Sequence, residues 1–117
     1  KKHIINRKWF DEFGLDGIKD QHINTLSGGE KQKLFLSRLM SFNQNNLFLD
    51  EPNQGLDLES EKLFIELISQ EKHKKTILIT LHDFEIAKKI ADSILYLDKG
   101  KIYIYEETHQ FFNKFHV

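Results

Sequence analysis

The feature that most constrains the fold is a regular alternation of short apolar runs with helical periods along the middle of the chain. Three runs are typical of strands, and the first two of them are typical of strands buried on both faces: Leu47–Leu49, Thr76–Leu81 and Ser93–Leu97. Between them, Leu58–Ser69 and the segment after Asp83 have the apolar spacing of helices. This order predicts an α/β fold with all three strands in one parallel sheet, joined by right-handed crossovers.

Shorter elements are predicted on either side of this region. Trp9, Phe10 and Phe13 indicate a short helix that ends in a glycine-containing turn. A longer helix should begin at Ser27, where a Ser-x-x-Glu capping box starts, and its dense apolar residues predict that most of its circumference is covered. After the third strand we expect an antiparallel hairpin into Lys101–Tyr105 and a final helix that packs its three phenylalanines.

The composition excludes several classes of protein. A chain of 117 residues with 39% hydrophobic and 30% charged residues fits one globular core and excludes a disordered tail. No apolar run is long enough for a membrane span, and a net charge of -1 gives no basic field for nucleic acid. The absence of cysteine excludes disulfides and thiol chemistry. Because the first residue is Lys1 rather than Met, we expect the natural N-terminus to lie upstream.

Polar residues with useful chemistry follow the first two predicted strands. Asp50 and Glu51 come directly after the first, and carboxylates at this edge of a parallel sheet suit Mg²⁺ binding and the activation of water. His82 follows the second strand and could contact a terminal phosphate. The glycines after Ser27 open a helix whose N-terminus can bind an anion. Each feature also has a structural alternative: a capping box, an exposed strand end, or an ordinary polar histidine.

Four segments in one order, Leu26–Lys33, Leu47–Pro52, Gly55–Asp57 and His82, resemble the ATP-binding cassette (ABC) ATPase family. They match its signature motif, Walker B strand, D-loop and switch histidine, and the resemblance extends from about Trp9 to the C-terminal tail. It implies a P-loop NTPase-like (RecA-like) parallel sheet with flanking helices, incomplete here, plus the signature helix of the helical subdomain.

The resemblance also implies a role for individual residues. Asp50 would be the Mg²⁺ ligand and Glu51 the general base for water. His82 would contact the γ-phosphate, and Asp57 would lie at the interface of the family's head-to-tail dimer. The implied cofactor-binding residues are Ser27, Gly28, Gly29, Glu30 and Asp57.

Two parts of the family's pattern are missing. No Gly-x-x-x-x-Gly-Lys-Ser/Thr P-loop occurs, and no Q-loop glutamine precedes the signature, where Gln21 is the only glutamine. We therefore expect residues 1–117 to form the C-terminal part of one nucleotide-binding domain. The P-loop strand belongs in the middle of the family's sheet, so the isolated chain should expose apolar faces, be poorly stable, and neither bind nor hydrolyse ATP well. Asn53 and Gln54 also replace the family's usual threonine and small residue.

The resemblance implies an ATP-hydrolysing subunit of an ABC transporter, with ATP and Mg²⁺ as cofactors. Its partners would be a second nucleotide-binding domain and transmembrane subunits, at the cytoplasmic face of a membrane. Ala91–Ile102 favours this interpretation because it resembles the segment after the switch histidine in transporter cassettes. One alternative is a soluble ABC-type ATPase of DNA repair or chromosome maintenance, which should carry a heptad repeat that residues 1–26 do not show. The other is a non-enzymatic half-cassette that only binds a partner, although intact acidic residues and His82 argue against it.

Three remaining groups are interpreted as structural. Lys72–Lys75 is typical of a solvated turn, so no direct nucleic-acid contact is expected. The tyrosines at 96, 103 and 105 are expected to pack rather than to stack on bases. The other histidines lack metal-ligand spacing and are expected at the surface: His3, His22, His73, His109 and His116.

Overall fold

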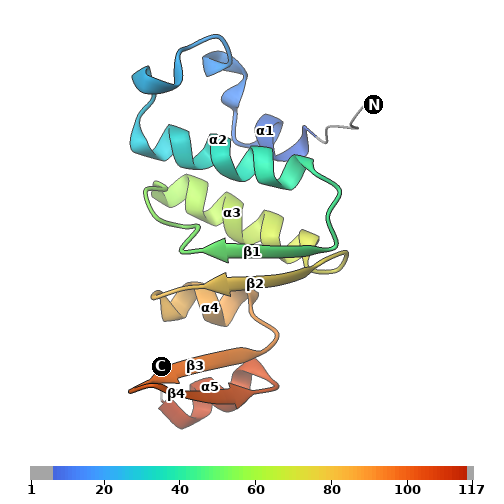
Figure 1. The fold of residues 1–117 in the computed structure, drawn as a ribbon, viewed down its shortest axis with the longest axis vertical. Coiled ribbons are helices and arrows are strands. Elements are labelled where there is room, and N and C mark those ends of the chain that lie inside the picture. The colour runs from blue at the N-terminus through green and yellow to red at the C-terminus, as the bar shows by residue number, and fades with distance from the viewer. Residues whose placement is uncertain (1–6, 116–117) are drawn as a thin grey trace. The chain divides into compact units, whose positions relative to one another are not determined.

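A computed structural model describes residues 7–115 of the chain (Figure 1). The chain divides into two compact units, Lys1–Thr80 and Leu81–Val117. The first unit contains α1 (Lys8–Glu12), two 3₁₀ turns (Leu15–Ile18 and Ile23–Thr25), α2 (Gly28–Ser41), β1 (Asn46–Asp50), α3 (Leu58–Glu71) and β2 (Thr76–Thr80). The second contains α4 (Phe84–Ile90), β3 (Ile94–Asp98), β4 (Lys101–Tyr105) and α5 (Thr108–Phe115).

Strands β1 and β2 form the parallel pair that the sequence predicts, with α3 as the connection between them. The register runs from Asn46 opposite Thr76 to Asp50 opposite Thr80. Only one face of β1 is covered, so burial on both faces is not found, whereas the expectation that this chain exposes apolar faces is confirmed. Leu47 and Leu49 are buried on that face, whereas Phe48 keeps 76% of its surface exposed on the other. Leu78, its partner across the pair, is 48% exposed, so the two strands present an open apolar face.

Strand β3 does not join this parallel pair, and the prediction of one three-stranded sheet is wrong for the residues described. Its ladder partner is β4, in antiparallel register from Ile94 opposite Tyr105. The turn between them places Lys99 at φ 47° and Gly100 at φ 76°, and two such left-handed residues suit a tight hairpin. A hairpin needs contacts only between neighbours in sequence, whereas parallel pairing of β3 needs a distant strand at its other edge.

An aromatic contact between α1 and α3 lies in the core of the first unit. Trp9 is 1% exposed, and its ring lies 5.8 Å from that of Phe13 and 6.3 Å from that of Phe64. Helix α2 contributes Leu36 and Met40 to the same core, but its Phe35 is 59% exposed. The prediction that most of α2 is covered is therefore wrong on the side that carries Phe35.

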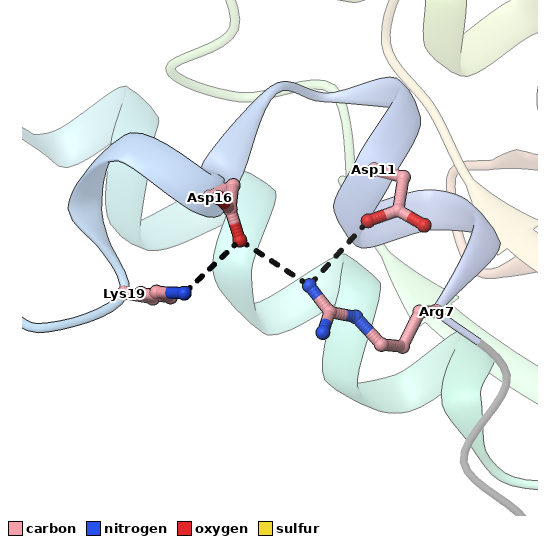
Figure 2. A network of polar contacts seen from close by, with 4 residues as sticks. All are labelled: Arg7, Asp11, Asp16 and Lys19. Atoms are coloured by element: carbon pink, nitrogen blue, oxygen red, sulfur yellow. Dashed lines mark hydrogen bonds and ion pairs between the residues drawn. The ribbon is translucent and has the colours of Figure 1, made fainter.

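Charged residues connect α1 to the 3₁₀ turn that follows it (Figure 2). The Arg7 guanidinium lies 3.5 Å from the Asp11 carboxylate and 3.4 Å from that of Asp16, which in turn lies 3.6 Å from the Lys19 ammonium. All four side chains are more than half exposed, so each ion pair contributes little stability. The network orients this corner of the unit without forming part of its core.

Aromatic packing organises the second unit. The ring of Phe111, on α5, lies 5.3 Å from both Tyr96 and Tyr105, on β3 and β4, and 5.9 Å from Phe84 at the start of α4. This confirms the predicted packing for Tyr96, Tyr105 and the final helix, whereas Tyr103 is 41% exposed and contacts Tyr96 alone among the rings described. The opposite side of the hairpin is apolar and open, with exposed fractions between 54% and 72% for Leu95, Leu97, Ile102 and Ile104.

Among residues 7–115, none of the helices combines the length and the hydropathy needed to cross a bilayer.

The contrast between the covered and open faces predicts different costs of truncation. Phe64 is fully buried, so Phe64→Ala should lower the free energy of unfolding by about 3–5 kcal/mol or abolish the cooperative transition. Phe48→Ala, the matched change on the open face, should cost less than about 1 kcal/mol. Urea denaturation followed by circular dichroism measures both, and equal losses would contradict the open face.

Candidate functional site

The carboxyl ends of β1 and β2 bring a threonine against the two acidic residues. Because Thr80 lies opposite Asp50 in the parallel register, its hydroxyl can donate a hydrogen bond to Asp50 Oδ1, at 2.5 Å. The same hydroxyl oxygen accepts a bond from the backbone N–H of Glu51 at 2.9 Å. Thr80 therefore fixes both acidic residues at the strand end, a role that none of the sequence motifs indicates. Aligning the two strands from their carboxyl ends is the signal that could have found it.

Glu51 adopts a left-handed backbone conformation, with φ 45°. Such a conformation is uncommon for a residue with a side chain and persists when surrounding contacts hold it. Its N–H also bonds to the Thr80 carbonyl oxygen at 3.1 Å, and the Gln54 N–H donates to the Glu51 carbonyl oxygen at 3.2 Å. The side-chain amide of Gln54 donates to Glu51 Oε2 at 2.7 Å. The chain thus turns sharply at the acidic pair and is held there on both sides.

The start of α2 forms the predicted capping box. The Ser27 hydroxyl accepts a bond from the Glu30 N–H at 3.1 Å, and Glu30 Oε1 accepts one from the Ser27 N–H at 2.8 Å. The predicted capping box is therefore confirmed, and the Glu30 carboxylate has a role within the helix cap. The N-terminus of α2 also carries the positive end of the helix dipole, since Gly28 and Gly29 begin the helix.

The beginning of α2 lies directly against the loop that follows β1. A Cβ atom added to Gly29 would lie 2.7 Å from the Gly55 carbonyl oxygen, so the close contact requires glycine at position 29. One turn further on, the Gln32 side-chain amide donates to the Pro52 carbonyl oxygen at 2.8 Å. The loop is consequently anchored on α2 at two points, one on each side of Asn53 and Gln54. The structure thereby brings the predicted signature segment beside the residues that follow the acidic pair.

Comparison with known proteins gives the family. A family model described as "ABC transporter" matches residues 3–54. The energy-coupling factor transporter ATP-binding protein EcfA2 of Mycoplasmoides gallisepticum is 33% identical over 112 residues, which are 95% of this chain and 34% of that protein. The phosphonates import ATP-binding protein PhnC of Fusobacterium nucleatum is 34% identical over 100 residues, or 84% of this chain and 40% of that protein.

These comparisons support a fragment of an ABC transporter ATP-binding domain. The chain spans between 34% and 41% of the length of these curated relatives and others like them, and so corresponds to part of the family's ATP-binding domain.

Solved structures of ABC proteins share the fold. A dimeric ATP-binding cassette in a post-hydrolysis state, bound to ADP and Pi, matches with a TM-score of 0.69 at 22% identity, over 85% of this chain and 45% of that one. A chain from the complex of archaeal ribosomal stalk protein aP1 with the ribosome recycling factor aABCE1 matches with a TM-score of 0.79 at 24% identity, over 92% of this chain and 22% of that one. The ABC fold is thus established, although identities this low establish nothing beyond it.

The two remaining predicted site residues lie at the start of α3 and in the loop after β2. Asp57 is the N-cap of α3, where its Oδ1 accepts a bond from the Ser60 N–H at 2.8 Å. Hydrogen bonds from the Ser60 side chain and backbone lower the pKa of Asp57, and the nearby charge of Lys33 adds to this. His82 is exposed in the loop after β2 and belongs to the second compact unit.

The carboxylate oxygens at the end of β1 fit a Mg²⁺ ion whose other ligands come mainly from a nucleotide. Asp50 is exposed and offers hard carboxylate oxygens, which magnesium prefers, and Thr80 fixes the orientation of one of them. Residues 7–115 contain no group of three or more His, Cys, Asp or Glu side chains that could hold a metal ion. One or two carboxylates completed by phosphate oxygens and water are the usual arrangement for this ion.

The lowered pKa of Asp57 predicts a pH-dependent contribution to stability. A carboxylate whose pKa is depressed in the folded state stabilises fully above its ordinary value of 3.8, and this contribution disappears as the pH falls through the lowered value. Asp57→Asn keeps an N-cap but removes the titrating carboxylate. The free energy of unfolding of this variant, relative to the natural chain, should therefore be lowest above pH 3.8 and should recover in more acid solution. Urea denaturation across this range measures the difference, and parallel pH profiles would contradict it.

Proposed function

We propose that the chain is the C-terminal part of an ATP-hydrolysing nucleotide-binding domain of an ABC transporter. The observation that carries this proposal is the acidic pair at the carboxyl end of a parallel strand, fixed by Thr80 and flanked by a loop anchored on the glycine-rich start of α2. Phosphoryl-transfer sites need a carboxylate near the metal and a second one near the attacking water. Asp50 and Glu51 supply both in adjacent positions.

In the proposed reaction Glu51 accepts a proton from water while the water oxygen bonds to the γ-phosphorus of ATP. The bond between that phosphorus and the bridging oxygen breaks, and ADP and phosphate leave. When bound, Mg²⁺ would offset the negative charge on the phosphate oxygens, with Asp50 as its protein ligand. His82 would bond to the γ-phosphate, and the fixed turn at Glu51 keeps its carboxylate at the end of the strand.

The start of α2 is proposed to act across a dimer interface. Ser27, Gly28 and Gly29 present backbone N–H groups at a positive helix end, which suits a phosphate held by a second nucleotide-binding domain. Glu30 and Asp57 are the other proposed cofactor-binding residues, and both already cap helices. We infer that they act on ATP indirectly, by shaping the starts of α2 and α3. The ADP-bound cassette that shares this fold is dimeric, which is compatible with a second nucleotide-binding domain as the partner.

We infer that a segment carrying the P-loop completes the domain. Each compact unit contains a two-stranded sheet with one open apolar face, formed by Phe48 and Leu78 in the first unit and by hairpin residues in the second. Parallel sheets are normally covered on both faces, and isolated two-stranded sheets are only marginally stable. A further strand and helix in that segment would supply this cover and the phosphate-binding loop together.

The relatives support transport rather than another use of the fold. Two proteins more than 30% identical to this chain are named as a transporter ATP-binding protein and as an import ATP-binding protein. We therefore propose transmembrane subunits as partners, a place at the cytoplasmic face of a membrane, and no direct contact with nucleic acid.

The complete domain, in which this chain is joined to its P-loop segment, tests the proposal. Glu51→Gln should keep ATP binding but lower the rate of hydrolysis by about 10²- to 10⁴-fold, because the general base is lost. Glu12→Gln, the same change at an exposed position on α1, serves as the control and should leave both unchanged. Phosphate release and binding of a fluorescent ATP analogue measure the two properties. Unchanged hydrolysis in Glu51→Gln, or hydrolysis by residues 1–117 alone, would contradict the proposal.

A further inference from the structure

Gln54 makes two hydrogen bonds to Glu51. Its side-chain Nε2 donates to Glu51 Oε2 at 2.7 Å, and its backbone N–H donates to the Glu51 carbonyl oxygen at 3.2 Å. Gln54 is exposed and lies in the loop between β1 and α3. Nothing in the packing of the core requires a glutamine there, so the contact with Glu51 is the feature that distinguishes this side chain.

The surrounding loop holds Gln54 at the distance at which this contact forms. Pro52, on one side, is bonded through its carbonyl oxygen to Gln32 of α2 at 2.8 Å. Gly55, on the other side, has a left-handed φ of 78° and lies in close contact with Gly29 of the same helix. Gln54 therefore projects from a segment that is fixed at both ends. Its amide can reach the Glu51 carboxylate without further ordering of the backbone.

A hydrogen bond at this position selects one orientation of the carboxylate. The terminal torsion of a glutamate is broad, so a glutamate carboxylate rotates readily unless a partner holds it. A donor on Oε2 fixes the plane of the group, and a near-attack geometry requires such fixing. The amide is neutral and neither gives up nor takes a proton. It can therefore orient a carboxylate that must accept a proton, whereas a lysine at the same place would favour the charged form more strongly.

We propose that Gln54 is a positioning residue for the carboxylate of Glu51. The inference rests on the proposed function of Glu51 as the general base. A small side chain at position 54 would not reach Oε2, so the contact depends on the length of the glutamine side chain.

Steady-state ATP hydrolysis by the complete domain with Mg²⁺ tests the role. Gln54→Ala should lower kcat about tenfold and leave KM for ATP unchanged, because a misplaced base affects the reaction rather than substrate binding. Gln54→Glu, of the same size, should lower kcat further, since it places a second carboxylate against Glu51. Gln44→Ala, a matched change in the exposed loop before β1, should behave as the natural protein does. Thermal unfolding of the variants should be unchanged, which separates positioning from a structural role.

The failure of this inference can be told apart from the failure of the proposed function. If Glu51→Gln leaves hydrolysis unchanged, the proposed function fails and the role of Gln54 fails with it. If Glu51→Gln abolishes hydrolysis while Gln54→Ala or Gln54→Glu keeps the natural kcat, only the role of Gln54 is overturned. A readout without turnover is the NMR signal of the Gln54 side-chain amide, which should shift in Glu51→Ala. The absence of a shift would also overturn the inference.

Discussion

The parallel pairing of β1 with β2 is the constraint on which the site depends. It places Thr80 opposite Asp50, and the threonine hydroxyl then has one oxygen that can donate to the aspartate and accept from the next backbone N–H. A shift of one residue in this register would turn Thr80 to the other side of the sheet and leave both acidic residues without this support. The geometry of the site is therefore a consequence of backbone pairing, and the polar contacts consolidate it.

Helix α2 supports the same site through its contacts with the loop that follows β1. Gly29 has a structural requirement, since any Cβ would collide with the Gly55 carbonyl oxygen, and Gln32 holds the loop at Pro52. Because these contacts lie near the helix N-terminus, a displacement of α2 would move the loop next to Glu51. The capping box adds stiffness at the same point, so Ser27 and Glu30 contribute to the site through the helix end they form.

The sheet of each compact unit has one open apolar face. Phe48 in the first unit and Leu97 in the second are each more than 70% exposed, unusually high for large apolar side chains in the interior of a strand. On the opposite face of the same sheet, the first unit buries Leu47 and Leu49, and the second unit packs Tyr96 and Tyr105 against Phe111. Each sheet is thus covered on one face only, as expected of a part of the longer ATP-binding domain to which the chain is related.

The sequence by itself determined the local elements and the candidate chemistry. The capping box at Ser27, the tight hairpin and the packing of α5 follow from contacts among residues close in the chain, where propensity and spacing are decisive. The parallel connection through α3 follows from the order of strand, helix and strand patterns. Only the tertiary structure decided that β3 pairs away from the parallel strands, that Phe35 is exposed, which residues form the open sheet faces, and that Thr80 and Gln54 hold the acidic pair. These features depend on strand neighbours and on the register between distant segments. The apolar pattern of one strand records that a face is to be buried, but it does not record which segment buries it.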